Sequence, residues 1–351
     1  MENKSAPVKT VPLVVTGFGN VGRAFFSLLR EKREDLKCRY GLALDVLAVA
    51  QAEGCFYYGG PLEVRHISRG GEPWTSGNPS WRAGMKAADI IKETRPGGCL
   101  VECTLSNLET GEPGLSYITG AFQGGWHAVA ASKGALVVGL PDLKARAAEN
   151  GVFLKFSGAT AAALPTLDVG LFSLAGARIE GIQGILNGTT NYILTRMGEG
   201  LDYAEALQEA QTKGIAEPDP AQDIGGWDTA GKILLITNAC LDAAYALKDV
   251  QVCGIAGVSA DFVRSARKEG RSVKLLATSA PGRKGGRWSL DVRPSLIDAT
   301  HPLVHVNGTE KGISFLTDSM GTVTVTGGRS SPRGAAAALL KDIINIYRPP
   351  F

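Results

Sequence analysis

The chain has 351 residues, which is more than one typical domain and enough to bury a sizeable core. Its 37 basic and 34 acidic side chains nearly balance, so no strong field favours nucleic acid or an anionic membrane as a partner. No apolar run approaches the roughly 18 residues of a transmembrane helix, and the polar start is unlike a signal peptide.

The cysteines indicate the compartment. The six of them are scattered along the chain with no C-x-x-C pair, at Cys38, Cys55, Cys99, Cys103, Cys240 and Cys253. This distribution is typical of reduced core thiols and not of a disulfide framework. We therefore expect a cytoplasmic protein.

A glycine-rich turn stands between the first predicted strand and the first predicted helix. The β-branched run at residues 11–16 predicts a buried strand, and an apolar helical pattern begins at residue 23. Between them lies the G-x-G-x-x-G motif formed by Gly17, Phe18, Gly19, Asn20, Val21 and Gly22. Glycine clusters also make ordinary turns, but in this position they let a pyrophosphate approach the backbone and a helix pack on a strand. We predict a dinucleotide site with its phosphates at the helix N-terminus.

The end of the second predicted strand bears on the choice of cofactor. The strand covers residues 45–50, and a carboxylate following it would normally bind the ribose 2′-hydroxyl. Gln51 holds that place and binds a hydroxyl less strongly than an ionised acceptor. Glu53 adds a negative charge nearby, so we expect NAD rather than NADP. A 2′-phosphate would need a basic residue from elsewhere, such as Lys37, Arg39 or Arg65.

Two further strands are predicted at residues 99–104 and 128–131. Polar residues lie at or just after the end of each strand, where a doubly wound sheet binds its ligand. They are Thr104, Ser106 and Asn107 at the first and Ser132 and Lys133 at the second. These residues either line a nicotinamide pocket or serve only as turn formers. With a helix at residues 142–149, the alternation predicts a Rossmann-type α/β fold, a doubly wound parallel sheet over residues 1–150.

The second half has a different pattern. Strands are predicted at residues 152–156, 182–186 and 288–293 among longer helices, which indicates a second, α+β domain over residues 151–326. The basic run at 282–287 is expected in an exposed hairpin turn, and an alanine-rich helix is expected at 333–346.

The run Gly214–Lys232 concentrates four carboxylates and a lysine. Asp219 and Pro220 predict the start of a helix that continues through residues 233–236. Asp228 and Lys232 are four residues apart and share one face of that helix. They form either a surface pair worth only about 0.3–0.5 kcal/mol or, beside the small and apolar residues 224–227, a positioned cation that acts as a proton donor.

These motifs together resemble homoserine dehydrogenases. The family signature G-Y-x-E-x-D-P-x-x-D-x-x-G-x-D-x-x-x-K is matched, with Ile215 in place of tyrosine, at Glu217, Asp219, Pro220, Asp223, Gly226, Asp228 and Lys232. A second block, G-x-x-N-G-T-T-N-Y-I-L, is matched by residues 184–194, which include Asn187 and Thr189. Lys133 matches the lysine of an A-N-K-G-P-L block, while Ser132 and Ala135 depart from it. The resemblance covers nearly the whole chain and is patchier after Gly327.

The resemblance implies reversible hydride transfer between a nicotinamide and C4 of a four-carbon amino acid, which interconverts homoserine and aspartate semialdehyde in threonine and methionine biosynthesis. It implies catalytic roles for Lys133, Lys232 and Asp228, and substrate contacts from Glu217, Asp223, Asn187 and Thr189. It also implies a homodimer held by the second domain, with the C-terminal segment 327–351 packing back on the nucleotide domain. We therefore do not expect feedback inhibition through a regulatory ACT domain.

Metal binding is not expected. Homoserine dehydrogenases often hold a monovalent cation in a block of the type E-A-x-V-x-x-G-I-P, which appears here at residues 157–165. Ser157 replaces the acidic ligand, which argues against that cation. His301 and His305 are four residues apart but lack a nearby third ligand for zinc.

Two alternatives remain at the level of sequence. Departures from the family pattern suggest a related dehydrogenase for another small hydroxy or oxo acid; they are Gln51, Ser132, Ser157 and Trp227. A non-catalytic dinucleotide-binding redox sensor is the other, and retention of both lysines and all motif acids argues against it.

Overall fold

The computed structural model describes residues 7–57, 59–62, 80–282, 286–328 and 330–348. The chain divides into two compact units, Met1–Ala159 with Ala335–Phe351, and Thr160–Gly334. The division therefore falls at Ala159 and not at residue 150. Arg65, considered above for a 2′-phosphate, lies outside the described residues.

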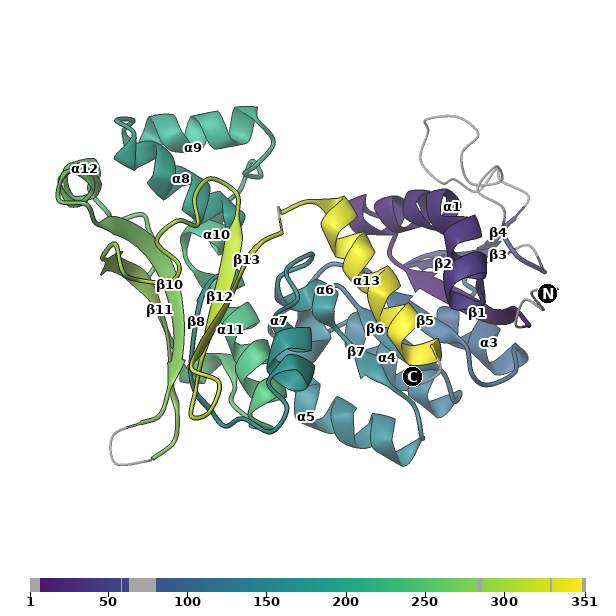
Figure 1. Ribbon diagram of the computed structural model, residues 1–351. Coiled ribbons are helices and arrows are strands. Elements are labelled where there is room, and N and C mark those ends of the chain that lie inside the picture. The colour runs from purple at the N-terminus through teal and green to yellow at the C-terminus, as the bar shows by residue number, and fades with distance from the viewer. Residues whose placement is uncertain (1–6, 58, 63–79, 283–285, 329, 349–351) are drawn as a thin grey trace, which may run out of the picture. The chain divides into compact units, whose positions relative to one another are not determined.

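The first unit is built on a seven-stranded sheet in the order β4-β3-β2-β1-β5-β6-β7 (Figure 1). Its strands are β1 Lys9–Thr16, β2 Leu42–Gln51, β3 Gly54–Tyr57, β4 Trp81–Ala83, β5 Cys99–Glu102, β6 His127–Ala130 and β7 Leu154–Lys155. Five neighbouring strands, β2, β1, β5, β6 and β7, are parallel to one another. The remaining two, β3 and β4, pair antiparallel at one edge of the sheet. This sheet confirms the predicted doubly wound class, because the carboxyl ends of β1, β2, β5 and β6 meet at one edge.

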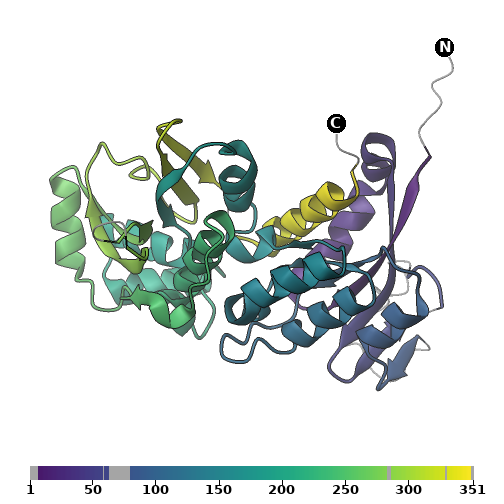
Figure 2. The same cartoon turned by 90° about the horizontal axis from the view of Figure 1, so that it is seen from below.

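Helices lie on both faces of this sheet. They are α1 Asn20–Tyr40, α3 Ala87–Glu93, α4 Gly114–Gln123, α5 Gly134–Glu149 and α13 Pro332–Tyr347. Apolar side chains of α1 and α13 share one core cluster with alternate residues of β1, and the two helices run side by side in the view from below (Figure 2). The expected helix at 142–149 is the second half of α5, which has a kink at Gly139.

The second unit contains a six-stranded mixed sheet in the order β13-β12-β8-β10-β11-β9. The strands are β8 Ile179–Ile185, β9 Val250–Val252, β10 Ser272–Ala280, β11 Ser289–Ile297, β12 Lys311–Thr317 and β13 Thr322–Gly327. All neighbouring pairs are antiparallel except β11 with β9. The antiparallel pair of β10 and β11 flanks the basic run, of which residues 283–285 lie outside the described part.

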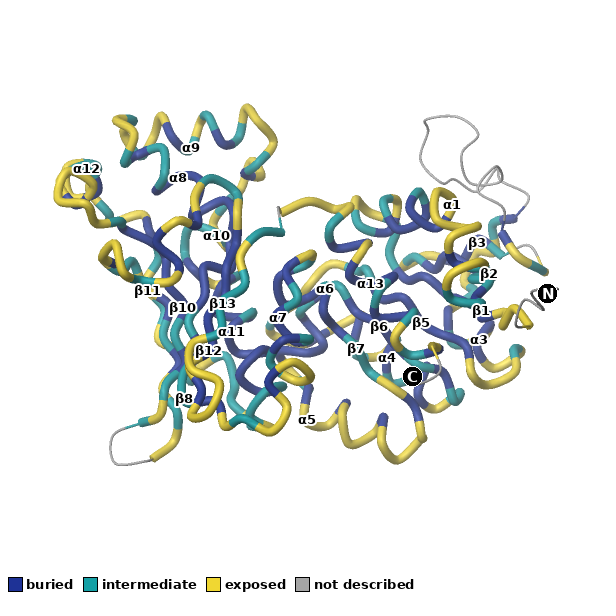
Figure 3. The backbone as a smooth tube through the Cα atoms, in the orientation of Figure 1, coloured by how far each residue is buried: buried dark blue, intermediate teal, exposed yellow. Residues whose placement is uncertain are grey.

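Helices of the second unit are α8 Gly188–Gly198, α9 Tyr203–Thr212, α10 Ala221–Ile224, α11 Trp227–Cys240 and α12 Ala260–Lys268. Short turns precede or connect them: α6 Ser157–Thr160, α7 Thr166–Asp168, the π-turn η1 Val169–Ser173 and the 3₁₀ turn η2 Leu247–Asp249. The tube in Figure 3 shows α11 buried along most of its length, whereas α9 and α12 expose one side. α11 is therefore the central helix on which the sheet packs.

The predicted continuous helix from Asp219 to Ile236 is wrong. The structure has two helices, α10 and α11, because Gly226 adopts the left-handed conformation with φ +84°. Only glycine takes this conformation without strain, so the chain turns here and α11 starts afresh. Asp219 still supports the start of α10, since its Oδ1 accepts a hydrogen bond of 3.1 Å from the Ala221 backbone N–H.

All six cysteines are free thiols. The expectation that they all lie in the core is wrong for Cys38 and Cys253, which are exposed. Among the described residues, no helix combines the length and the apolar character needed to cross a membrane.

Candidate active site

The glycine-rich turn joins β1 to α1 with a close approach of backbone segments. Gly17 has φ +80°, and a Cβ at this position would lie 2.5 Å from the Cys103 carbonyl oxygen. A Cβ at Gly22 would lie 2.5 Å from the Gly17 carbonyl oxygen, so the helix can pack against the turn only with glycine there. Gly19 precedes α1 with open space around it and no side-chain cap on the helix. The free N–H groups at this helix start fit a pyrophosphate.

The other residues of the G-x-G-x-x-G motif, and the residues at the end of β2, lie around this helix start. Phe18 packs edge to face on Phe26, with ring centroids 5.3 Å apart, while Asn20 is exposed and Val21 is half-buried in the first turn of α1. Gln51 ends β2 next to this turn, since the Gly17 N–H donates to the carbonyl oxygen of the neighbouring Ala50 at 2.9 Å. Glu53 follows two residues later and is exposed.

A buried carboxylate joins the loops that follow β5 and β6. Glu102, the last residue of β5, is 0% exposed and accepts hydrogen bonds from the Thr104 backbone N–H at 2.8 Å and from the hydroxyls of Thr104 and Ser132. A further bond of 2.9 Å runs from the Lys133 backbone N–H to the Ser106 Oγ. Burial raises the pKa of Glu102, against the effect of the hydrogen bonds from Ser132 and Thr104. Thr104, Ser106 and Lys133 therefore belong to one linked pair of loops.

In the second unit the predicted acids and lysine meet at the N-terminus of α11. The Asn187 side-chain amide donates to Asp223 Oδ1 at 2.7 Å and to Asp228 Oδ2 at 2.8 Å. Lys232 Nζ donates to the same Asp228 Oδ2 at 2.6 Å and to the Leu186 carbonyl oxygen at 3.0 Å. We call the four side chains of Asn187, Asp223, Asp228 and Lys232 the carboxylate–lysine cluster.

The burial of this cluster argues against the surface-pair alternative for Asp228 and Lys232. Both side chains are 14% exposed, and each has partners beyond the other. A solvated surface pair would be mobile and weak, whereas removing one partner from a buried pair typically costs about 3–5 kcal/mol. The pair is therefore a fixed part of the site and not a surface contact.

Asn187 is itself held in place. It is 5% exposed and caps α8, since its Oδ1 accepts a hydrogen bond of 2.9 Å from the Thr190 backbone N–H. The cap fixes the amide so that both of its N–H bonds point to carboxylates. Burial raises the pKa of the partly buried Asp223, with the charge of Asp228 acting in the same direction and Lys232 opposing it.

Thr189 lies at the edge of the cluster, and Glu217 follows two residues after its hydrogen-bond partner Ile215. The Thr189 hydroxyl donates to the Ile215 carbonyl oxygen at 3.1 Å and contributes a hydrogen bond that lowers the pKa of Asp223. Glu217 is exposed, and no salt bridge joins it within the part of the chain that the structure describes. Its carboxylate is thus open to solvent, unlike those of Asp223 and Asp228.

A second lysine near the cluster was not predicted from the sequence. Lys311, at the start of β12, is 2% exposed and donates to the Ala161 carbonyl oxygen at 2.7 Å. Burial lowers the pKa of Lys311 to about 7, with Lys232 acting in the same direction and Asp228 opposing it. A lone lysine in a polar turn gives no sign of such burial in the sequence.

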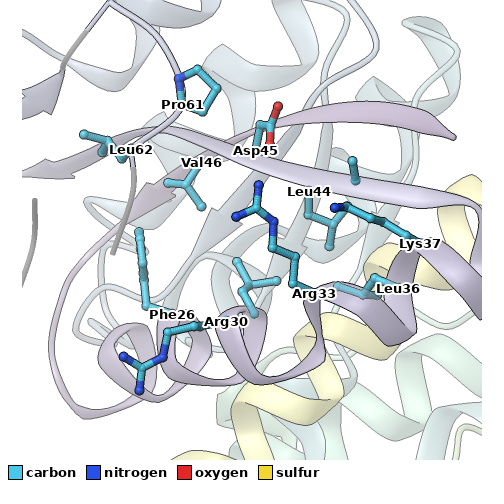
Figure 4. Close-up of a pocket in the computed structure, with 12 residues that line it drawn as sticks. Phe26, Arg30, Arg33, Leu36, Lys37, Leu44, Asp45, Val46, Pro61 and Leu62 are labelled. Carbon is cyan, nitrogen blue, oxygen red and sulfur yellow. The ribbon is translucent and has the colours of Figure 1, made fainter. Parts of the chain in front are cut away.

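A hollow of about 290 Å³ in the first unit is lined by residues of α1 and β2 and by Pro61 and Leu62 (Figure 4). Apolar residues of α1 and β2 form its floor, and the Arg33 side chain extends from α1 toward Asp45 at its rim. Its β2 residues lie in the amino-terminal half of the strand, whereas a doubly wound sheet binds its ligand at the carboxyl ends. The hollow is therefore not the dinucleotide site.

Comparison with known proteins agrees with this geometry. Residues 165–344 match the family model of homoserine dehydrogenase. A homoserine dehydrogenase of Methanocaldococcus jannaschii is 36% identical over 95% of this chain and 98% of its own length. An NAD(+)-dependent homoserine dehydrogenase of Pseudomonas canavaninivorans is 33% identical over 96% of both chains. The crystal structure of a putative homoserine dehydrogenase from Archaeoglobus fulgidus superposes with a TM-score of 0.83 at 31% identity, over 97% of this chain and all of that one.

The chain belongs to the homoserine dehydrogenase family. The family predicted from the signature at residues 214–232 and the block at 184–194 is thereby confirmed. Homoserine dehydrogenases are NAD(P)-dependent oxidoreductases, so the enzyme class is confirmed with the family.

The raised pKa of Asp223 leads to a prediction on stability. A carboxyl whose pKa is higher in the folded than in the unfolded protein destabilises the fold above its ordinary range near pH 4, because the folded state must then lose a proton at a cost. Asp223→Asn removes the charge and keeps an acceptor for Asn187. We expect this variant to have a higher Tm than the wild type at neutral pH, with the difference shrinking toward about pH 4.

Thermal unfolding of the two proteins across that pH range measures the effect. A Tm difference that does not change with pH would show that Asp223 contributes through packing and not through its charge. Asp219→Asn is a suitable control, since Asp219 is an exposed acid of the same segment.

Proposed function

We propose that the chain catalyses the reversible oxidation of L-homoserine to L-aspartate 4-semialdehyde, with a nicotinamide dinucleotide as the hydride carrier. The observation that carries the proposal is the carboxylate–lysine cluster, in which Lys232 is fixed by Asp228 and by the Leu186 carbonyl oxygen. The glycine turn of the first unit supplies the matching cofactor site.

Lys232 is proposed as the group that handles the proton. A nicotinamide bound at the glycine turn would supply the hydride chemistry at C4 of the substrate. In the reduction the Lys232 ammonium donates a proton to the carbonyl oxygen, and in the oxidation the neutral Lys232 amine takes the proton from the alcohol. Asp228 keeps this ammonium in one orientation through the bond of 2.6 Å. Lys133, at the start of α5, is proposed to polarise the same oxygen and to contact the nicotinamide.

The substrate ammonium requires anionic acceptors. Asp223 and the exposed Glu217 are proposed for this role, with Asn187 and Thr189 keeping Asp223 in position. The geometry that supports this is the hydrogen bond of 2.7 Å from the Asn187 amide to Asp223 Oδ1, which fixes the orientation of the carboxylate.

The alternatives are a dehydrogenase for another small hydroxy or oxo acid and a non-catalytic sensor. An absorbance assay for reduced nicotinamide, run with homoserine and then with other hydroxy acids, separates the three. Turnover with homoserine at a kcat/KM at least about tenfold above any other substrate supports the proposal. Turnover only with another acid, or none at all, overturns it.

Lys232→Ala tests the proton role. We expect kcat to fall on the order of a hundredfold or more, because the positioned proton donor is lost, while NAD binding stays near the wild-type value. Steady-state kinetics with homoserine measure kcat, and a separate fluorescence titration measures the affinity for NAD.

Lys268→Ala is the matched control, since Lys268 is an exposed lysine of the same unit in α12. It should keep the wild-type kcat. A Lys232→Ala enzyme with unchanged kcat would rule out the proton role.

We propose NAD as the preferred cofactor. Gln51 ends β2 without the cation that a 2′-phosphate needs, and the carboxylate of Glu53 is close to it in the chain. A phosphate near Glu53 would be repelled, at a cost that ranges from tenths to a few kcal/mol with exposure. The relative from Pseudomonas canavaninivorans named for NAD(+) is consistent with this choice.

Glu53→Arg should therefore relax or reverse the preference, measured as the ratio of kcat/KM for NAD and NADP. Glu53→Gln is its control and should shift the ratio less, because it removes the repulsion without adding an attraction. A wild-type enzyme that favours NADP by about tenfold or more would contradict the proposal.

We also propose a homodimer formed through the second unit. On β12 the side chain of Leu316 is 48% exposed, whereas the other residues of the strand are buried. A large apolar side chain exposed there fits a second copy of the chain. A cytoplasmic location is proposed because all six cysteines are free.

A further inference from the structure

The block that often holds a monovalent cation in homoserine dehydrogenases lacks an open anionic ligand here. Ser157 stands where that block has an acid, and its hydroxyl donates to Asp342 Oδ1 at 2.8 Å and accepts from Lys341 Nζ at 2.9 Å. Asp342 is 2% exposed and also pairs with Lys341 at 3.2 Å. The carboxylate that contacts the start of the block is thus already neutralised by an ammonium.

A carbonyl oxygen further along the block is also bound by a lysine ammonium. Proteins bind K⁺ with backbone carbonyl oxygens that replace its hydration shell. The carbonyl oxygen of Ala161 accepts a hydrogen bond of 2.7 Å from the ammonium of Lys311, which is 2% exposed. At Ser157 and Ala161 this block therefore does not fit a bound monovalent cation.

The ammonium of Lys311 also acts on the carboxylate–lysine cluster. Asp228 attracts it and Lys232 repels it. The cluster alone holds two carboxylates and one lysine, and Lys311 brings a second positive charge that balances them. A buried group of charges is stable only when its charges are compensated.

We propose that the Lys311 ammonium supplies the positive charge that homoserine dehydrogenases often take from a monovalent cation, so that this enzyme needs neither K⁺ nor Na⁺. The inference rests on the proposed homoserine dehydrogenase activity. Lys311 is a positioning residue: it holds the Ala161 segment and balances the charge beside Asp228 and Lys232, without touching the reacting atoms.

The test compares kcat and Tm in about 100 mM KCl, NaCl or tetramethylammonium chloride, at equal ionic strength and about pH 6, where Lys311 carries its proton. A bound cation stabilises the folded protein by mass action, so Tm reports binding independently of activity. For the wild type we expect the same Tm and a kcat equal within about twofold in all three salts.

The variant Lys311→Met removes the charge and keeps the length of the side chain. We expect its kcat to fall by about tenfold or more, with part of the loss restored and its Tm raised by K⁺ or Na⁺. Lys274→Met is the matched control, because Lys274 is also 2% exposed in the second unit but donates to Asn191, Val306 and Asn307. Its Tm should not respond to K⁺ or Na⁺.

Two results would overturn the inference: a wild-type enzyme activated about tenfold or stabilised by K⁺ or Na⁺, or a Lys311→Met enzyme with the wild-type kcat. If Lys311→Met does not fold, the wild-type salt series still decides. An enzyme without activity on homoserine in any salt contradicts the proposed function instead, and a cation effect on Tm alone then tests the site.

Discussion

The contact on which the site depends is the amide of Asn187 between two carboxylates. Asp223 and Asp228 repel each other, and burial strengthens that repulsion. The amide donates one N–H to each of them, at 2.7 and 2.8 Å, and Lys232 adds a positive charge at 2.6 Å from Asp228. Without this bridge the two acids could not share one pocket at neutral pH, so the proton-handling lysine would lose its fixed position.

The local backbone explains why these side chains meet. Asn187 can aim both N–H bonds outward because its Oδ1 is engaged in capping α8. The left-handed turn at Gly226 separates α10 from α11, so that Asp223 comes from one helix and Asp228 from the next. One continuous helix would place these two acids five residues apart on different faces and could not direct both at one amide.

Much of this arrangement was visible in the sequence because it depends on short-range patterns. The strand, glycine turn and helix at residues 9–40 follow from local propensity and steric need, as does the pair of Asp228 and Lys232 four residues apart. The break at Gly226 was missed because the start signal at Asp219 and Pro220 and the apolar run at 233–236 were given more weight than two adjacent glycines. The cysteine prediction failed at Cys38 for a similar reason, since composition does not tell which face of α1 a residue occupies.

Contacts between distant segments could not be predicted in this way. Ser157 and Asp342 are 185 residues apart, and nothing near either of them indicates their bond. Lys311 is 2% exposed and donates to Ala161, which is 150 residues away in the sequence, and nothing near either residue indicates this contact. The sequence gives a weak indication that Glu102 is special, because it is an acid at the end of an apolar strand. Its hydrogen bond with Ser132, however, depends on the pairing of β5 with β6.

The central claim is that Asp228 acts through Lys232. A double-mutant cycle on kcat/KM with Asp228→Asn, Lys232→Ala and the double variant tests it most directly. If Asp228 serves to hold the lysine, its replacement matters little once the lysine is gone, and the double variant should retain at least about tenfold more activity than the product of the two single losses predicts. Losses that simply multiply would show that the two residues act independently and would contradict the account.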